Sequence, residues 1–544
     1  MSTSNDHKLP EGATSTHTIE LGGKRLDYIA RADWIPIRRR EKTIAEMFHV
    51  AYVLADSDPT ERPITFVFNG GPGAASAYLH MGAVGPKRAV FNDDGTPPAP
   101  PARIEDNNES WLAFSDLVFI DPIGTGFSRA VDEESAAGSG GGERNDPDDG
   151  DRREARAAGH GGYEEARAIR DLVGGSGGDA GGDRPAKSGK KPEEEFFGLK
   201  RDLESLCEFI RSFLSRHGRW RSPAFIAGES YGGYRVGKLA RLLQERYGVG
   251  LNGALLISPA LEFHTLDRSD YDLLPWIDAL PSYSLAATVH GKQSAVEISG
   301  SPHSEAAVAS VREAAERFAA RDLPALLTLG DTLPERERGR VYARLARLTG
   351  LPRDFVARKA GRIGIRAFAR ELLRESRRVL GLYDASVGII DPYPDRERYE
   401  GPDATLMAID RVFSAGINTQ LRENIGLKSE RDYHLLSFDV NKAWKVDYER
   451  HALESHIGAT DDLRYGIQLN PHMHVRISHG IYDLVTPYYA SERLAANMKL
   501  DDAARARVSL RHYPGGHMFY TWQHSRAAFT RDVAAFYRAA TGRG

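Results

Sequence analysis

Four short runs of almost unbroken apolar residues limit the folds open to this chain. They lie at residues 64–68, 117–120, 224–227 and 254–257. Strands with one face in water alternate apolar and polar residues, whereas strands covered by helices on both faces are apolar throughout. An amphipathic, helix-like segment at 200–215 lies between two of these runs. The pattern predicts an α/β fold with a mostly parallel central sheet, to which later segments at 475–478 and 508–513 add strands.

Two segments interrupt this pattern and suggest a division into parts. Residues 131–196 are rich in Gly, Asp, Arg, Glu, Ala and Ser and contain few large apolar side chains, so we expect a disordered insertion there. Residues 266–464 contain amphipathic, Arg- and Ala-rich segments and predict a mainly helical cap. Residues 1–130, 197–265 and 465–544 would together form the domain that contains the sheet.

The composition argues against several classes of protein. The 544 residues are 41% hydrophobic and carry a net charge of −4, so no excess of basic charge points to binding of nucleic acid or an acidic membrane. No stretch reaches the roughly 18 apolar residues of a membrane helix, and the polar N-terminus lacks the apolar core of a signal peptide. Cys207 is the only cysteine, so no intrachain disulfide can form. We expect a cytoplasmic protein, and its oligomeric state stays open.

A G-x-S-x-G motif at residues 228–232 places Ser230 between an apolar strand and a helix with apolar residues at helical spacing. Such a strand-to-helix turn exposes the serine hydroxyl and directs a helix N-terminus at developing negative charge. Ser230 is therefore the predicted nucleophile. A second G-x-S-x-G match at 174–178, around Ser176, lies in the low-complexity segment and has neither element beside it.

A serine nucleophile needs a base and an acid that orients the base, and two later residues follow in the expected order. Asp483 comes shortly after the segment 475–478, and His517 lies in a Gly-Gly-His loop after 508–513. Both would stand at the carboxyl ends of strands, where α/β sheets bind ligands. The alternative reading is that these are ordinary loop residues that cap helices or face water.

Four ordered motifs resemble those of the serine carboxypeptidases. They are the Asn-Gly-Gly-Pro-Gly loop at 69–73 with Gly-Pro at 85–86, the turn at 121–128, the motif around Ser230, and the pair Asp483 and His517. The resemblance implies an α/β-hydrolase fold and a peptide substrate. The residues at 74–76 and 111–112 are similar to a cysteine-poor bacterial branch of that family.

The resemblance also implies roles for residues around the nucleophile. The backbone N–H groups of Gly71 and Tyr231 would bind the oxyanion, a contribution of roughly 3–4 kcal/mol per donor. A substrate's terminal carboxylate would be held by Asn69, Gly70 and Glu229. The chain departs from the family at three points. Ala83 stands where the family has a second glutamate, and Val67 stands where it has a tryptophan. The family's disulfide cysteines are also absent from this sequence.

The sequence thus predicts a serine-type carboxypeptidase that forms an acyl-enzyme on Ser230 and needs neither metal nor other cofactor. His472 and His474 have alternate spacing on a strand but no evident third ligand, so we do not expect a metal site. The first alternative is an esterase or acyltransferase, which would use the same triad on an ester rather than a peptide. A non-catalytic binding protein with this fold is the other.

Replacing residues 135–192 with a short Gly-Ser linker should leave the melting temperature nearly unchanged. A segment with few large apolar side chains buries little apolar surface and so adds little to the free energy of unfolding. Thermal unfolding followed by circular dichroism checks this. A large drop in Tm would show that the segment packs against the rest of the protein.

Overall fold

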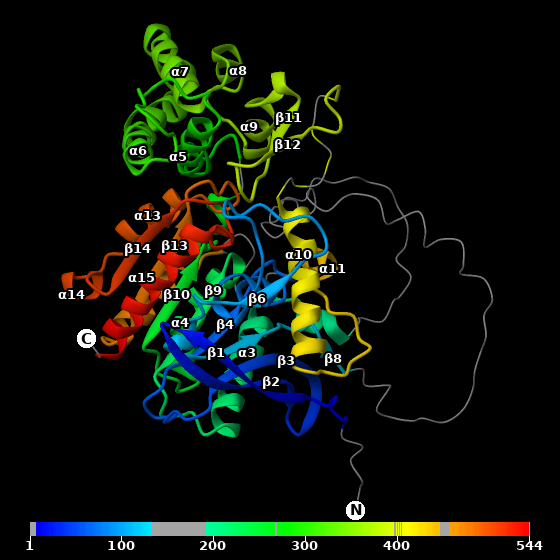
Figure 1. The fold of residues 1–544 in the computed structure, drawn as a ribbon. Helices are drawn as coiled ribbons and strands as arrows, with labels where there is room; N and C mark the ends of the chain where they lie inside the picture. The colour runs from blue at the N-terminus through cyan, green and yellow to red at the C-terminus, as the bar shows by residue number, and fades with distance from the viewer. Residues whose placement is uncertain are drawn as a thin grey trace, which may run out of the picture.

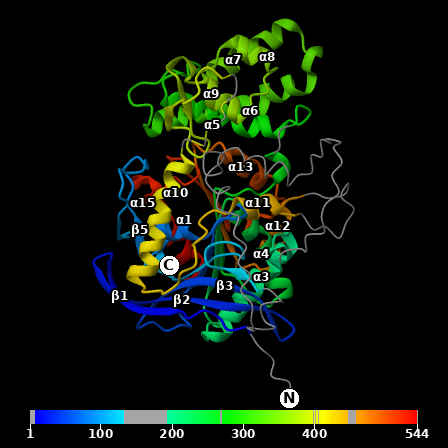
Figure 2. The ribbon, with the colours of Figure 1, turned by 90° about the vertical axis from the view of Figure 1, so that its right-hand side faces the viewer.

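The computed structural model describes residues 7–131, 192–266, 269–396, 399, 401, 403, 405–445 and 457–542. The insertion predicted at 131–196 therefore lies almost entirely outside the described residues. The described chain forms a sheet domain with a helical cap above it, and two views at right angles agree on this arrangement (Figures 1 and 2).

One ten-stranded sheet runs through the described part of the sheet domain. Its strands, in spatial order, are β1 (Ala13–Leu21), β2 (Lys24–Arg39), β3 (Lys42–Leu54), β7 (Asp116–Ile120), β4 (Ile64–Phe68), β9 (Ala224–Glu229), β10 (Gly253–Ile257), β13 (His474–Gly480) and β14 (Val508–Tyr513), with β8 (Arg129–Ala130) beside β3. The pairs from β7 to β14 are parallel, and those from β1 to β7 are antiparallel. The predicted mostly parallel sheet is confirmed.

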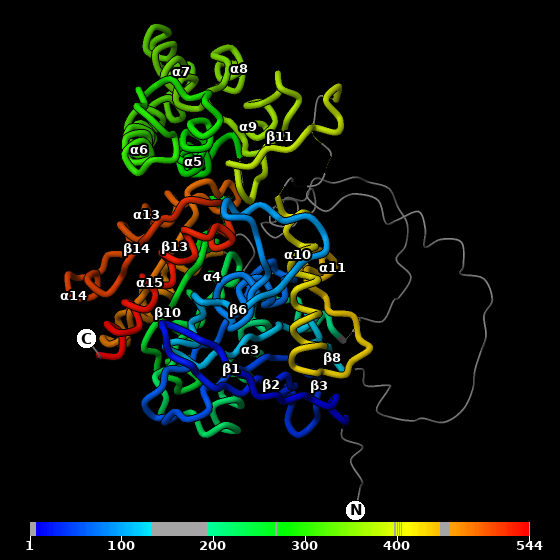
Figure 3. The backbone as a smooth tube through the Cα atoms, in the orientation of Figure 1, coloured from blue at the N-terminus to red at the C-terminus, as the bar shows by residue number. Residues whose placement is uncertain are grey.

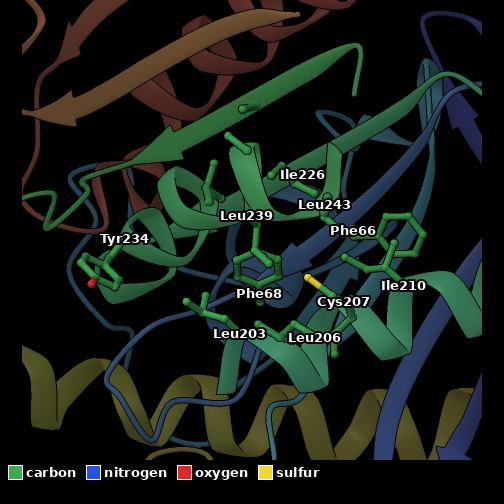
Figure 4. Packing of buried hydrophobic residues seen from close by; sticks show 14 of the residues in the cluster. Phe66, Phe68, Leu203, Leu206, Cys207, Ile210, Ile226, Tyr234, Leu239 and Leu243 are labelled. Carbon is green, nitrogen blue, oxygen red and sulfur yellow. The ribbon is translucent and has the colours of Figure 1, made fainter. Parts of the chain in front are cut away.

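Helices cover both faces of the sheet because its central strands are apolar on both faces. One face packs on α3 (Leu199–Arg216), α4 (Tyr231–Arg246) and α12 (Thr460–Leu469), and Figure 4 shows Phe66 and Phe68 of β4 among the residues of α3 and α4. The other face, which includes Val67, packs on α1 (Ala77–Leu79), α10 (Leu406–Thr419) and α15 (Gln523–Thr541). With a serine turn between β9 and α4 at the centre, this is the α/β-hydrolase fold.

The cap has a hydrophobic core of its own. It consists of α5 (Leu274–Val289), α6 (Glu305–Leu329), α7 (Glu335–Thr349), α8 (Arg353–Arg358), α9 (Ile365–Glu371) and the hairpin of β11 (Arg378–Leu380) and β12 (Gly388–Ile390). Helix α5 is buried along nearly its whole length, between the other cap helices and α13 (Tyr488–Ala496) of the sheet domain. An ion pair joins the two parts, since Arg493 of α13 lies 2.6 Å from Asp278 of α5.

Residues 266–464, which the sequence groups into one cap, contribute to different cores in the structure. After the cap hairpin, α10 and α11 (Phe438–Ala443) lie along the sheet domain, as Figure 3 shows, and α12 packs on α4. Helix α10 buries Val412 and Phe413 in the core of the sheet domain. Its Asp410 also accepts a hydrogen bond from Tyr78 at 2.9 Å. Local helical periodicity cannot distinguish such a helix from one that packs in the cap.

The remaining short elements complete the sheet domain. They are β5 (Lys87–Ala89), β6 (Ile104–Asp106) and α14 (Asp502–Arg505).

Among the described residues, no helix combines the length and the apolar character needed to cross a membrane.

Candidate active site

Ser230 occupies a sharp turn between β9 and α4. Its φ of 60° and ψ of −123° are rare for a residue with a side chain, and the surrounding backbone holds it there. Its N–H donates to the carbonyl of Ile257 at 3.0 Å, and its carbonyl accepts from Ala260 at 3.1 Å. The turn also needs Gly228, because a Cβ at that position would lie 2.2 Å from the carbonyl oxygen of Gly232. The local geometry is that of a nucleophile elbow.

Asp483 lies three residues beyond the end of β13 and is fully buried. Its Oδ1 accepts the backbone N–H groups of Val485 at 2.8 Å and Thr486 at 3.0 Å. Its Oδ2 accepts the Thr486 hydroxyl at 2.7 Å and lies 2.7 Å from Nδ1 of His517. These bonds fix the carboxylate so that one oxygen faces the imidazole.

His517 is held from its backbone as well as from its ring. Its carbonyl accepts the hydroxyl of Ser258 at 2.7 Å, and Ser258 directly follows β10, the strand next to β9. Because Nδ1 faces Asp483, Nε2 is the ring nitrogen left to accept a proton. The charges of His517 and Asp483 both act on the pKa of Glu229, the residue before Ser230. The ends of β9, β13 and β14 therefore bring the three predicted triad residues to one region.

The glycine loop at 69–73 lies directly against the elbow. A Cβ at Gly70 would lie 2.5 Å from the amide nitrogen of Tyr231 and 2.7 Å from the carbonyl oxygen of Glu229. Gly71 has a φ of 95°, a conformation that favours glycine. The side-chain amide of Asn441, in α11, donates to the carbonyl of Pro72 at 3.0 Å and holds the loop from the other side. The loop thus brings Gly70, the residue before Gly71, close to the Tyr231 amide.

Glu229 is buried beside the elbow and is bonded by two neighbours. Tyr520 donates its hydroxyl to both carboxylate oxygens at 2.9 Å, and Asn69 donates its side-chain N–H to one of them. Burial raises the pKa of Glu229 to about 7, against the opposing effects of His517, Tyr520 and Asn69. Near neutral pH this carboxyl group is therefore partly protonated, although Ala83 stands where a second acid was expected. The sequence gives no motif for Tyr520, which only the fold brings to Glu229.

The basic residues that follow Ala83 or precede it closely in the chain all have partners in the structure. His80 bonds to the Tyr52 hydroxyl at 2.7 Å, and burial lowers the pKa of this histidine to about 3, so it is neutral. Lys87 is paired with Asp106 at 2.5 Å. Arg88 is paired in the same way with Glu105. Each of these three residues is thus engaged with a neighbour other than Glu229.

The described residues include no cluster of three or more His, Cys, Asp or Glu side chains arranged to hold a metal ion. His472 is exposed at the start of the strand region, and the ring of His474 meets the edge of Phe536 at 6.3 Å between centroids.

A family model described as serine carboxypeptidase matches residues 30–276. Over this range the chain is similar to the serine carboxypeptidases. The matched residues include the glycine loop, Glu229 and Ser230, whereas Asp483 and His517 lie beyond them. Together, the fold and the match to this family model identify the protein as a serine hydrolase.

Two curated relatives share short stretches with this chain. The pheromone-processing carboxypeptidase KEX1 of Yarrowia lipolytica is 40% identical over 83 residues, which are 15% of this chain and 12% of that protein. Carboxypeptidase S1 of Penicillium janthinellum is 36% identical over 80 residues, 14% of this chain and 17% of that protein. The chain therefore matches less than a fifth of either relative's length. Both relatives are fungal, so these comparisons give no support to the bacterial branch expected from the sequence.

Similarity to solved structures is weak. A soluble variant of monoglyceride lipase from Saccharomyces cerevisiae is 10% identical, covers 93% of this chain and 99% of its own, and has a TM-score of 0.32. A score this low carries no argument. The fold assignment depends instead on the strand order and the elbow.

Gly70→Ala should lower kcat by roughly 10²–10³-fold, the usual cost of losing an oxyanion donor. The added methyl group would meet three backbone atoms within 2.8 Å, among them the Tyr231 amide nitrogen, so the loop and elbow must separate. Gly250→Ala is the matched control, since a Cβ there meets nothing within 4 Å. Steady-state kinetics with an ester substrate measure the effect, and equal rates for both variants would contradict it.

Proposed function

We propose that this protein is a serine-type carboxypeptidase that hydrolyses C-terminal peptide bonds through an acyl-enzyme on Ser230. The observation that carries the proposal is the 2.7 Å contact between Asp483 and His517, buried beside the elbow that presents Ser230. Similarity to serine carboxypeptidases over residues 30–276 supports the same activity.

In the proposed reaction, Nε2 of His517 takes the hydroxyl proton of Ser230 as Oγ attacks the substrate carbonyl. The N–H groups of Gly71 and Tyr231 bind the oxyanion that forms. The C–N bond then breaks, and His517 gives the proton to the departing amine. A water molecule, deprotonated by His517, attacks the acyl-enzyme and releases the acid with the Ser230 hydroxyl restored. Asp483 keeps Nδ1 protonated and stabilises the imidazolium in both halves.

Recognition of a free C-terminus is proposed for Glu229, Asn69 and Gly70, which lie together beside the elbow. A carboxylate substrate is repelled by an ionised Glu229 but can accept a hydrogen bond from the protonated form. A pKa of about 7 leaves much of Glu229 protonated in mildly acidic and neutral solution. This supports a carboxypeptidase that works best below neutral pH.

An esterase or acyltransferase with the same triad is the second candidate. The observation in its favour is Ala83, because an alanine at this position cannot share a proton with Glu229 as a second acid would. Above pH 7 such a site would accept uncharged esters or amides more readily than free acids. A non-catalytic binding protein would not need the bonds that orient Asp483 and His517.

Ser230→Ala should abolish covalent labelling by a fluorophosphonate probe while leaving the melting temperature unchanged, because the variant lacks only the nucleophilic oxygen. Ser176→Ala, which alters the other G-x-S-x-G match, is the control and should label like wild type. Hydrolysis of a peptide, its C-terminal amide and a simple ester by the wild type separates the two candidate activities. Labelling of the Ser230→Ala variant would show that another residue is the nucleophile.

Tyr520→Phe should move the pH dependence of free-acid hydrolysis to higher pH. For wild type, kcat/KM for a free-acid peptide relative to an ester should fall as pH rises through about 7, where Glu229 becomes charged. The Tyr520 hydroxyl stabilises that charge, so its removal raises the pKa of Glu229 and delays the fall.

Tyr513→Phe is the matched control for this experiment. Its hydroxyl bonds Asp532 at 2.7 Å and Arg476 at 2.8 Å, away from Glu229, and its profile should follow wild type. A Tyr520→Phe profile that coincides with wild type, or moves to lower pH, would contradict the assignment of this ionisation to Glu229.

A further inference from the structure

A short strip of the cap, residues 382–385 between β11 and β12, is bonded to both loops that carry the proposed acid and base. On the acid side, the N–H of Leu484 donates to the carbonyl of Leu382 at 3.1 Å, and the N–H of Ala385 donates to that of Tyr482 at 3.0 Å. These two bonds are made by the residues on either side of Asp483. We call residues 382–385 the cap strip.

On the base side, the same strip bonds the backbone of the histidine loop. The N–H of His517 donates to the carbonyl of Tyr383 at 2.5 Å. The N–H of Gly516 donates to Oδ2 of Asp384 at 3.0 Å, and Nε1 of Trp522 donates to the same oxygen at 3.1 Å. The Tyr383 ring also meets the His517 imidazole edge-on, with centroids 5.2 Å apart.

The approach of the strip to the loop is close enough to require glycine. A Cβ at Gly516 would lie 2.0 Å from the carbonyl oxygen of Tyr383 and 2.5 Å from Cα of Asp384. The acid and histidine loops also share a direct backbone hydrogen bond, in which the N–H of Tyr482 donates to the carbonyl of Gly515 at 3.0 Å. The cap strip bonds residues that follow this pair in each loop, namely Gly516 and His517 in the histidine loop and Leu484 in the acid loop.

Asp384 is the one side chain of the strip that bonds the histidine loop through a carboxylate, and it is buried. Its Oδ1 accepts the N–H of Ser386 at 3.0 Å and the Ser386 hydroxyl at 2.5 Å. Burial raises the pKa of Asp384 to about 6, so at pH 8 it is ionised and both oxygens accept. An ionised acceptor makes stronger hydrogen bonds than a neutral one. This carboxylate therefore fixes Gly516 and Trp522 relative to the cap.

We propose that the cap strip positions the triad, and that Asp384 is a positioning residue which sets the orientation of His517 relative to Asp483. The inference rests on the proposed function, because it takes Asp483 and His517 as the acid and base. Asp384 acts through the histidine loop and does not touch the reacting atoms. A displacement of the strip would move two loops that must stay within a hydrogen bond of each other.

The test compares Asp384→Asn with Ser386→Ala at pH 8. An asparagine has one acceptor oxygen, so it cannot accept from both the Ser386 side and the Gly516 side. Ser386→Ala is the matched control, since it removes a bond to the same carboxylate on the side away from the histidine loop. Measured quantities are the rate of fluorophosphonate labelling, kcat and KM for an ester, and the melting temperature.

Asp384→Asn should lower both the labelling rate and kcat by about 10- to 100-fold, the effect expected when a catalytic group is displaced by about 1 Å. KM should stay near wild type, because the contacts to the ester are unchanged, whereas the melting temperature should fall modestly, because a buried N–H group loses its acceptor. The low-field proton resonance of the His517–Asp483 bond should shift or broaden in this variant and remain in Ser386→Ala. Wild-type rates and resonance in Asp384→Asn would overturn the proposal.

Trp522→Phe keeps the test decisive if Asp384→Asn does not fold. It removes the indole bond to Oδ2 and leaves the carboxylate in place, so a smaller decrease in kcat is expected, and an unchanged kcat would count against the proposal. The outcomes separate the two levels of inference. A wild-type protein that the probe does not label contradicts the proposed function. A labelled wild type with fully active variants contradicts only the role of the strip.

Discussion

The site depends on backbone segments that approach more closely than side chains would allow. A Cβ at Gly232 would lie 2.7 Å from the carbonyl oxygen of Phe68, and one at Gly233 would lie 2.3 Å from Cβ of Pro259. Together with Gly228 and Gly70, these residues let the ends of β4, β9 and β10 meet the first turn of α4. The elbow, the proposed oxyanion donors and the bonds of Glu229 all depend on this contact.

A buried ion pair supports the same contact from the helix side. Arg235 of α4 forms two hydrogen bonds to Asp202 of α3, at 2.8 and 2.9 Å, and donates a third to the carbonyl of Asn69 at 2.7 Å. Removing water from two charges is costly, and a paired, bidentate geometry is what offsets that cost. The pair links α3 and α4, two of the helices on one face, to the start of the glycine loop. Loss of either partner would leave a buried charge next to the proposed oxyanion donors.

The sequence predicts those features that local patterns encode. Apolar runs identify the central strands, and a polar residue just after such a run identifies Ser230 and Asp483, because strand ends and their loops follow one another in the chain. Tyr520 and Asp384 leave no such signal, since each acts on a residue more than 100 positions away. The sequence does not show where α10 packs, because this too depends on residues far away in the chain. Its apolar face would suit either core, and only the tertiary contacts decide between them.

The bonds from residues 382–385 have a consequence for redesign. A cap inserted between two strands of the sheet, with most of its core formed by its own residues, is a natural segment to replace with the cap of another protein. In this protein a chimaera that replaced everything between β10 and β13 would also lose the carbonyl of Tyr383 and the carboxylate of Asp384, which bond the histidine loop. A chimaera keeps these two bonds to the histidine loop only if the exchanged segment ends at or before β11.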